Sequence, residues 1–353
     1  MMSRRKTTHS LQAGFGIPEI MVGLAIGMVT VLVVMQLMTN FEGQKRATTG
    51  NADAQVNGTL ALDMVRRQIQ AAGFGLPVFS GTQQPLDCPV TMQFDHDNNP
   101  STPSFGIDPI VITDGGTGPG ASDTIAITSG DSPLGGAPIK IDSVAGNVVN
   151  VANNLGCNVN DVALVVNGSA CAMSRVVAKG AFTQITLQSA AGVASPANIS
   201  CMGNWTQTTY RVDATTSTLM ETGASGVAVP SVAGIVNIQA QYGLSDDKDK
   251  NEITSWVDAG GVVADPIDFR KRIKAVRIAI VARNGQLEKD NVTAPCSSLT
   301  TPSPTGLCAW AGTTANPAPA IDLSNDPNWR RYRYRVFQST IPLRNVIWSR
   351  EVL

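Results

Sequence analysis

The chain has 353 residues, of which 43% are hydrophobic, 15% charged and only 5% aromatic, and its formal net charge at pH 7 is -1. This length allows one large domain or two modest ones, and a nearly neutral chain has no global basic field that would attract nucleic acid. Few charged and aromatic residues, with abundant Gly, Ala, Thr, Val, Asn and Ser, are typical of a secreted β-rich protein with long loops.

The amino-terminal stretch joins a basic flank to a long apolar run. Arg4, Arg5 and Lys6 precede the run from Ile20 to Met38, which contains nothing more polar than one Thr and one Gln. At about 1.5 Å per residue, this run and the apolar residues before it approach the roughly 30 Å of a bilayer's hydrocarbon core. The apolar region of a secretory signal is shorter, and a small-residue cleavage site directly follows it. We therefore predict a membrane segment that is not removed as an ordinary signal peptide.

A carboxylate stands at the start of this run, in the segment Gly14-Phe15-Gly16-Ile17-Pro18-Glu19. An ionisable group at such a position is costly unless another group pairs with it. One interpretation is a lone Glu at the headgroup boundary of an ordinary anchor. The other is a charged partner, because an ammonium and a carboxylate that both lie in an apolar bundle neutralise each other best as a pair.

This segment resembles the class III leader of type IV prepilins, in which a basic leader ends in Gly and the mature chain begins with Phe and has Glu as its fifth residue. The resemblance implies that prepilin peptidase removes residues 1–14, cutting between Gly14 and Phe15, and methylates the new Phe15 amine. It also implies that the Glu19 carboxylate meets the amino-terminal amine of a neighbouring subunit in the filament. Pro18 departs from the two apolar residues that many members carry before the Glu, but proline is tolerated in the first turn of a helix.

The pattern after the apolar run continues to predict helix as far as Ala72. We expect residues 15–38 to lie in the membrane or filament core and residues 39–75 to form an amphipathic half that packs on a folded domain. Apolar residues recur at a spacing of four in two adjacent rows, which predict a buried stripe: Val56, Leu60 and Met64, and Ala61, Val65 and Ile69. On the opposite face stand Asp63, Arg66, Arg67 and Gln70, and Gly73, Gly75 and Pro77 end the helix.

Beyond Pro77 the apolar period changes to two, which predicts strands. The expected strands are Ile110–Thr113, Thr124–Thr128, Ile139–Val144, Val162–Val166, Arg175–Ala178, Phe182–Leu187, Thr208–Val212, Val232–Tyr242, Ile273–Arg283 and Tyr332–Val346. Because most are joined without helical patterns, we expect a largely antiparallel assembly. The predicted fold is therefore α+β: a long amino-terminal helix on a mostly antiparallel β-sheet domain over residues 76–353. Residues 86–108 and 290–328 are expected to be long surface loops, each pinned by a disulfide.

Six cysteines follow the membrane segment: Cys88, Cys157, Cys171, Cys201, Cys296 and Cys308. A basic flank that stays in the cytoplasm sends the rest of the chain into an oxidising space, so this even count suggests disulfides. Proximity favours Cys157 with Cys171 and Cys296 with Cys308, which leaves Cys88 with Cys201, but the connectivity stays open. No C-x-x-C occurs, which disfavours a zinc ribbon or a thioredoxin-like motif.

Three later segments resemble the closing segments of PilW-type minor pilins: Val232–Gly243, Ile273–Arg283 and Tyr334–Asn345. Met64–Gly75 resembles the end of their long helix. The resemblance implies a non-enzymatic subunit that acts with other minor pilins in a tip or priming complex and initiates pilus assembly. Its implied partners are the inner membrane, prepilin peptidase, the other minor pilins, the major pilin and a tip adhesin. Its implied location is the inner membrane, with the amino terminus cytoplasmic and the globular domain periplasmic, and then the pilus.

Two alternatives stay open. A large minor pseudopilin of a type II secretion or DNA-uptake filament would share every amino-terminal feature. A filament-displayed DNA-binding or adhesion subunit is suggested by Arg331, Arg333 and Arg335, which alternate with aromatic residues as in single-strand binders. A strand with arginines on one face and aromatics in the core explains the same alternation. The basic residues Arg270, Lys271, Arg272, Lys274 and Arg277 are expected to form a solvated strand edge, with a partner surface as the alternative.

Other candidate sites are weak. Asp247, Asp249 and Asn251 have the D-x-D-x-N spacing of a calcium loop, but Glu252 stands where an EF-hand requires Gly, so a polar hairpin turn is favoured. Asp95, Asp97 and Asn99 repeat the spacing. His96 is the only histidine outside the leader, so a Ser-His-Asp relay would have to include it and a multi-histidine metal site is excluded. We predict no catalytic residue and no cofactor.

Overall fold

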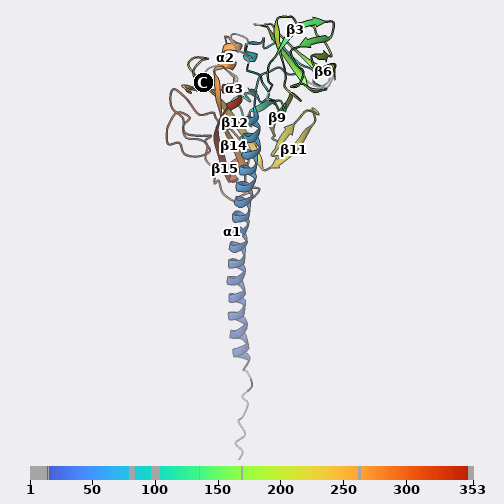
Figure 1. Cartoon of the computed structure of the whole chain (residues 1–353). Helices are drawn as coiled ribbons and strands as arrows, with labels where there is room; N and C mark the ends of the chain where they lie inside the picture. Colours follow the sequence, from blue (N-terminus) through green and yellow to red (C-terminus); the bar gives the residue numbers. More distant parts are fainter. Residues whose placement is uncertain are drawn as a thin grey trace, which may run out of the picture. The chain divides into compact units, whose positions relative to one another are not determined.

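The computed structural model describes residues 14, 16–78, 84–96, 104–134, 136–167, 170–260 and 264–348. The chain divides into two compact units, Met1–Gly50 and Asn51–Leu353. Helix α1, Ile17–Ala71, begins in the first unit and ends in the second (Figure 1). Gly73 and Gly75 follow it with φ angles of 73° and 87°, which only glycine adopts without strain, and the Gly73 N–H donates to Thr128 O (2.8 Å).

A five-stranded antiparallel sheet forms one layer of the second unit. Its order is β1-β2-β9-β10-β11, and the strand bounds are β1 Ile110–Thr113, β2 Thr124–Ser129, β9 Thr206–Asp213, β10 Thr218–Thr222 and β11 Ala228–Ala233. Strands β2 and β9 are neighbours in this sheet although the chain between them forms a separate barrel. The barrel is therefore an insertion into the sheet.

A four-stranded antiparallel sheet forms the second layer. Its order is β13-β12-β14-β15, with β12 Ile235–Leu244, β13 Ser255–Val257, β14 Ile273–Arg283 and β15 Tyr334–Pro342. Helix α2, Pro266–Arg272, precedes β14, the 3-10 turn η2, Trp329–Arg331, precedes β15, and helix α3, Arg344–Trp348, follows it. Helix α2 begins because Asp265 accepts hydrogen bonds from the N–H groups of Ile267 (2.9 Å) and Asp268 (3.0 Å) and a proline follows at the first helical position.

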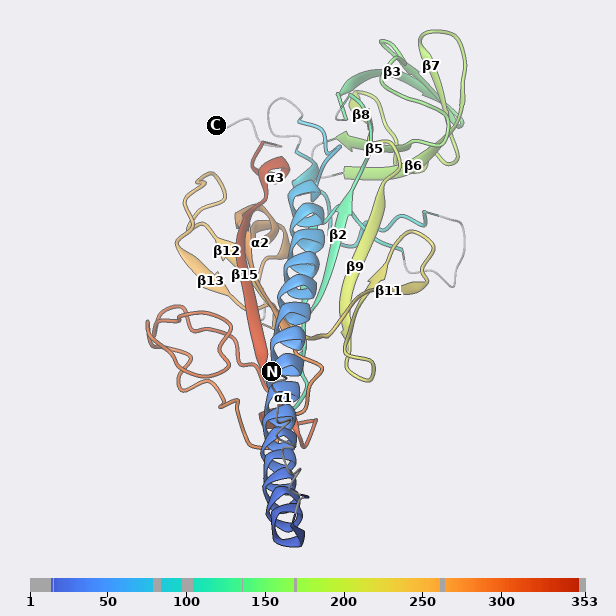
Figure 2. The same ribbon diagram turned by 90° about the horizontal axis from the view of Figure 1, so that it is seen from below.

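The inserted segment closes into a six-stranded barrel in the order β3-β4-β7-β6-β5-β8. Its strands are β3 Ile139–Ala145, β4 Val148–Val151, β5 Val162–Asn167, β6 Ala170–Lys179, β7 Gln184–Leu187 and β8 Ala197–Cys201. Fully buried side chains such as Ile141, Val149, Val176 and Ile185 fill its interior. Figures 1 and 2 show the barrel strands β3 and β6 apart from β12 and β15.

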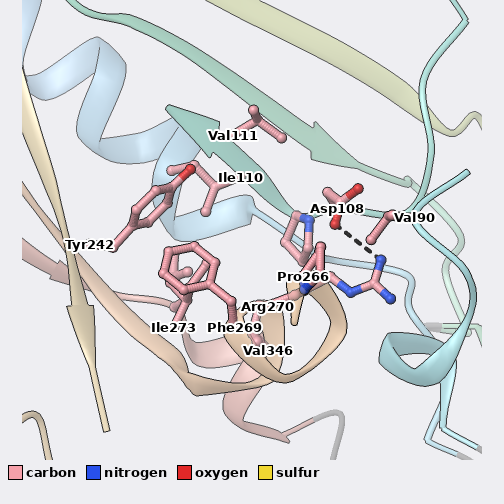
Figure 3. Close-up of a pocket in the computed structure, with 12 residues that line it drawn as sticks. Val90, Asp108, Ile110, Val111, Tyr242, Pro266, Phe269, Arg270, Ile273 and Val346 are labelled. Carbon is pink, nitrogen blue, oxygen red and sulfur yellow. Dashed lines mark hydrogen bonds and ion pairs between the residues drawn. The ribbon is translucent and has the colours of Figure 1, made fainter. Parts of the chain in front are cut away.

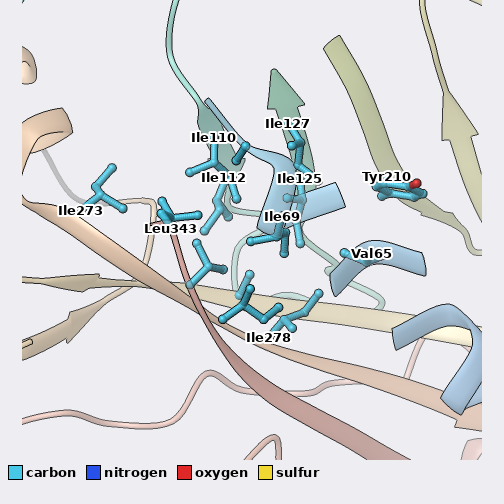
Figure 4. Close-up of a cluster of buried hydrophobic side chains, with 14 of the residues drawn as sticks. Val65, Ile69, Ile110, Ile112, Ile125, Ile127, Tyr210, Ile273, Ile278 and Leu343 are labelled. Atoms are coloured by element: carbon cyan, nitrogen blue, oxygen red, sulfur yellow. The ribbon is translucent and has the colours of Figure 1, made fainter. Parts of the chain in front are cut away.

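The two sheets share a core with the end of α1. Ala61, Val65 and Ile69 of α1 are fully buried and belong to one cluster with Ile125 of β2 and Ile278 of β14 (Figures 2 and 4). Each buried Val or Ile side chain contributes roughly 1.5–3 kcal/mol. This row of the predicted stripe is confirmed, and with it the predicted α+β fold of a long helix on mostly antiparallel strands.

The other predicted row is wrong at Val56 and Leu60, which are 63% and 48% exposed, whereas its third member, Met64, is partly buried against the core. The fully buried positions of α1 form a narrow line of small and branched residues, and Val56 and Leu60 lie beside this line and reach solvent. Gly58 lies on the line, where an added Cβ would come within 2.0 Å of the Phe337 ring. This glycine thus lets β15 approach α1 closely.

Several predicted element bounds also need correction. The predicted strand 232–242 is divided into β11 and β12 by Gly234, whose φ is 78°. The predicted strand 332–346 is β15 with η2 before it and α3 after it. Strands β4, β8, β10 and β13 and helix α2 were not predicted, because short strands and seven-residue helices show too little periodicity. The expected surface loop 290–328 covers the outer face of β14, where Leu307 and Trp310 are buried.

The structure contains three disulfides: Cys88–Cys171, Cys157–Cys201 and Cys296–Cys308. The pairing of Cys296 with Cys308 is confirmed, whereas the favoured pairs Cys157–Cys171 and Cys88–Cys201 are wrong. Cys157 and Cys201 belong to the barrel core, where β8 lies beside β5, whereas Cys171 packs against the main core and reaches the segment of the 3-10 turn η1, Pro85–Asp87. Sheet topology therefore outweighs proximity in the sequence.

Candidate functional site

The amino-terminal part of α1 presents apolar side chains on all sides. From Ile17 to Met38 its large apolar side chains are 50–77% exposed, and at about 1.5 Å per residue this length spans about 33 Å. The one hydroxyl of the span is satisfied within the helix, since Thr30 Oγ1 donates to Ile26 O (3.0 Å) and Gly27 O (2.8 Å). A surface of this kind is stable only in hydrocarbon or among similar helices.

Glu19 is the one charged residue of this span and lies in the first turn of α1. Its Oε2 accepts a hydrogen bond from the Gly16 N–H (3.3 Å), where the carboxylate also meets the positive end of the helix dipole. Pro18 stands at the second helical position, where a missing N–H costs nothing. Gly14 is exposed, and Phe15 lies outside the described residues. The carboxylate is thus held beside the backbone position at which the predicted mature chain would begin, and its other oxygen can accept from an amine.

The three alternating arginines all have intramolecular partners. Arg331 Nε donates to Glu288 O (2.8 Å), Arg333 Nε to Glu288 Oε1 (2.8 Å) and Arg335 Nε to Asn51 Oδ1 on α1 (2.8 Å). Only Arg335 is on β15, because Arg331 ends η2. These partners favour a structural role over a nucleic-acid surface, but the predicted single strand is wrong, because Arg331 and Arg333 precede β15.

The basic residues near α2 are not the solvated strand edge that the sequence suggests. Arg270 is only 4% exposed, and its guanidinium donates to Asp108 Oδ1 (3.0 Å), Leu86 O (2.7 Å) and Cys88 O (2.5 Å). Lys271 pairs with Asp87 of η1. The two neighbouring side chains therefore fix the η1 segment to α2, and no sequence signal distinguishes them from surface charges.

Arg277 of β14 is also enclosed. Its guanidinium lies 4.7 Å from the Trp256 ring centre and 4.2 Å from that of Trp310, and its Nη2 donates to Gln241 Oε1 (2.7 Å). Burial lowers the pKa of Arg277 to about 10, and Asp258 opposes the shift. Arg277 is charged at neutral pH and joins the long loop before β15 to the sheet.

The weak calcium candidate lies in the turn between β12 and β13. Asp247 Oδ1 accepts from the Asp249 N–H (2.9 Å), which closes a turn, and Asp246 pairs with Lys250 (2.8 Å). Within the described part of the chain, no group of three or more His, Cys, Asp or Glu side chains is placed to hold a metal ion. Asn251 is exposed, and the second candidate includes Asp97 and Asn99, which lie outside the described residues.

Asp123, which the sequence analysis missed, joins the two sheets. Only 3% of it is exposed, its Oδ1 accepts from the Gly115 N–H (3.0 Å), its Oδ2 accepts from the Ala240 N–H (2.7 Å), and its own N–H donates to Ile238 O (2.8 Å). Burial raises the pKa of Asp123 to about 6, Asp114 and Asp258 act in the same direction, and the two backbone hydrogen bonds oppose the shift. An Asp at the start of a strand gives no sequence signal of such a role.

The second unit is expected to lose stability as the pH rises through about 6. The Asp123 pKa is about 6 in the folded chain and about 3.9 when unfolded, so folding takes up a proton between these values. The contribution is fully present below about pH 4 and is lost above about pH 6, by about 3 kcal/mol in all. Thermal unfolding followed by tryptophan fluorescence at about pH 4.5 and 7.5 measures it. Asp123→Asn should reduce the difference in stability between the two pH values. Asp142→Asn, at an exposed position of the barrel, is the control and should keep this difference. An unchanged difference in Asp123→Asn would show that Asp123 is not the group responsible.

The described features define a class of protein. Its amino-terminal helix has an exposed apolar half with a glutamate in the first turn, and the same helix continues into the core of an antiparallel β-domain. Residues 203–345, which contain β9 to β15, match the family model described as PilW, Type IV Pilus-assembly protein W. The predicted resemblance to PilW-type minor pilins is confirmed over this region. No curated relative matches the chain. A solved structure of a type IV-like pilin from Thermus thermophilus is similar at 11% identity and a TM-score of 0.32, over 83% of this chain and 96% of that chain.

Proposed function

We propose that this chain is a minor pilin of the PilW type, which initiates type IV pilus assembly in a tip or priming complex with other minor pilins. The observation that carries the proposal is the exposed apolar span Ile17–Met38, with Glu19 in its first turn, in a chain whose residues 203–345 match a pilus-assembly family. Assembly then transfers an anchored helix from bilayer to filament core, since both surroundings exclude water from its side chains. This role needs no catalytic residue and no cofactor.

The proposal includes the processing steps. Prepilin peptidase would cut between Gly14 and Phe15 and methylate the Phe15 amine, while residues 15–38 hold the chain in the inner membrane and residues 76–353 fold in the periplasm. The basic flank supports this orientation because positive residues stay on the cytoplasmic side. The three disulfides support it as well, because such bonds form and persist in an oxidising compartment.

Peptide mass spectrometry of sheared surface filaments and of inner membranes tests the proposal. We expect a peptide that begins at methylated Phe15 in both fractions. If that peptide occurs only in membranes, the result would favour the pseudopilin of a type II secretion or DNA-uptake filament. A chain that keeps residues 1–14 in both fractions would show that the amino-terminal motif does not function as a prepilin leader.

Replacement of Glu19 with alanine is expected to leave cleavage after Gly14 intact and to reduce the ratio of filament to membrane protein about tenfold. In this variant the amine of a neighbouring subunit has no carboxylate partner in an apolar bundle. An unpaired charge there should destabilise the filament by at least roughly 1.4 kcal/mol, which corresponds to a tenfold change in the ratio. Quantitative immunoblots of both fractions give the ratio. Gln36→Ala, which changes another polar position of the same run, is the matched control. Normal incorporation of Glu19→Ala would exclude the pairing.

A second candidate, a filament-displayed binding subunit, is favoured by the inserted barrel. Its strands occupy residues 139–201, outside the matched region, and its loops expose Leu155 and Phe182 by 66% and 58%. In a chain in which a short turn replaces the barrel and Cys88 is changed to alanine, normal piliation with loss of adhesion or DNA uptake would support a binding role. Loss of piliation would instead support a role of the barrel in assembly.

A further inference from the structure

A pocket of 160 Å³ lies between the edge of the five-stranded sheet, helix α2 and strand β12 (Figure 3). The residues that line it include Ile110 and Val111 of β1, Tyr242 of β12, Phe269 of α2 and Ile273 of β14. Cavities of about 150 Å³ with apolar walls accept a benzene molecule. The pocket thus has room for one side chain the size of Leu or Phe.

Two hydrogen-bond donors of this pocket have no acceptor among the described residues. Arg270, which is 4% exposed, uses its two terminal nitrogens on Asp108 and on backbone oxygens, but its buried Nε–H has no partner. The Tyr242 hydroxyl oxygen accepts from the Ile112 N–H (2.6 Å), so its own proton is left to be donated. Buried donors of this kind are normally satisfied, which indicates a ligand with a carbonyl or similar acceptor.

An open strand edge adjoins the same pocket. Strand β1 is the edge of its sheet, and the Thr128 N–H donates to Pro109 O (2.9 Å). Because backbone direction alternates along a strand, the N–H and C=O groups of Val111 and Thr113 point to β2, whereas those of Ile110 and Ile112 point away from the sheet. The outward N–H of Ile112 is taken by Tyr242. The outward N–H and C=O of Ile110, which lines the pocket, have no hydrogen-bond partner among the described residues and can pair with another backbone.

We propose that this pocket receives one apolar side chain of an extended polypeptide segment from another pilus subunit, whose backbone carbonyl accepts from Arg270 Nε or the Tyr242 hydroxyl. Only a polypeptide supplies all three complementary features: an apolar side chain of this size, a carbonyl acceptor and backbone groups for the edge at Ile110. A small apolar molecule would supply the first alone. The partner's identity as a pilus subunit rests on the proposed function, whereas the binding of such a segment does not.

The test uses the full chain in detergent micelles with isoleucine methyl groups labelled for NMR. N-acetyl-leucine methylamide is the probe, and N-acetyl-glycine methylamide has the same backbone without the apolar group. We expect the leucine probe to shift the methyl signals of Ile110 and Ile273, and the glycine probe to leave them unchanged. Val90→Phe, at a half-buried residue of the lining, should fill part of the pocket and weaken the binding of the leucine probe about tenfold. Val229→Phe, on the opposite edge strand of the five-stranded sheet, is the matched control and should not.

Three results would overturn the proposal. The first is the absence of shifts at Ile110 and Ile273, and the second is an equal affinity of the Val90→Phe chain. The third is binding of toluene as tight as that of the leucine probe, which would assign the pocket to apolar molecules without a backbone. If deletion of residues 349–353 raised the probe's affinity, the chain's own end would be the occupant. Probe binding in a chain that never carries methylated Phe15 would keep the pocket and refute the pilus role.

Discussion

Replacement of Arg270 with methionine is expected to destabilise the second unit by about 3–5 kcal/mol, the usual cost of removing one partner from a buried ion pair. Arg270 is 4% exposed and is the hydrogen-bond donor for Asp108 Oδ1, Leu86 O and Cys88 O. Methionine fills a similar volume but donates nothing, so a partly buried carboxylate and two backbone carbonyls lose their donor. The loss is therefore one of unmet hydrogen bonds rather than of packing.

Thermal unfolding of the full chain in detergent, followed by tryptophan fluorescence, measures this effect. All five tryptophans lie beyond residue 50, so the signal reports the second unit. Arg270→Lys should fall between the wild type and Arg270→Met, since an ammonium keeps the charge but cannot reach all three acceptors. Arg211→Met, at an exposed position of β9, should change the midpoint little. A midpoint for Arg270→Met equal to that of Arg211→Met would show that the buried cluster contributes nothing.

The helix and the long strands could be predicted because their signals are local. The apolar run, the row Ala61, Val65 and Ile69, and the bounds of β1 and β14 follow from periodicity within a few turns or residues of the chain. The segment around Glu19 could be read for the same reason, because its motif occupies consecutive positions. Its contact in a filament remains a prediction, since that contact belongs to a second chain.

Contacts between distant segments could not be predicted. Nothing near Arg270 in the sequence indicates that it meets residues 86, 88 and 108, and nothing near Cys171 indicates that η1 is closer to it than Cys157. The Cys88–Cys171 bond depends on the insertion of the barrel between β2 and β9. The contacts of Arg270 depend instead on the packing of α2 against η1. Likewise Asp123 gains its role only because β12 folds against the start of β2. Charged residues of these types usually lie on the surface, and they have structural roles here because the fold brings distant segments of the chain together.

Removal of the Cys88–Cys171 disulfide by Ala substitutions is expected to cost about 4.5 kcal/mol, against about 3 kcal/mol for removal of Cys296–Cys308. The two bonds close loops with sequence separations of 83 and 12 residues, and the chain-entropy model gives the larger stabilisation to the longer loop. The comparison is internal, because both double variants are measured in the same full chain by the same fluorescence midpoint. An equal or reversed order would show that the entropy of the unfolded chain does not dominate.

The Cys88–Cys171 bond and Arg270 should not act independently. Both hold the η1 segment, Arg270 from α2 and Cys171 from the barrel. Without the disulfide this segment can move, and water can then hydrate its carbonyl groups. Arg270→Met should therefore destabilise the chain that lacks the disulfide by about 1 kcal/mol less than it destabilises the disulfide-bonded chain. Coupling of this size is usual for residues that share partners. Arg270→Met combined with loss of Cys296–Cys308, which holds a different loop, should be additive within about 0.5 kcal/mol. Additivity in both cycles would mean that the Cys88–Cys171 bond and Arg270 stabilise the chain independently, so that the η1 segment does not couple them.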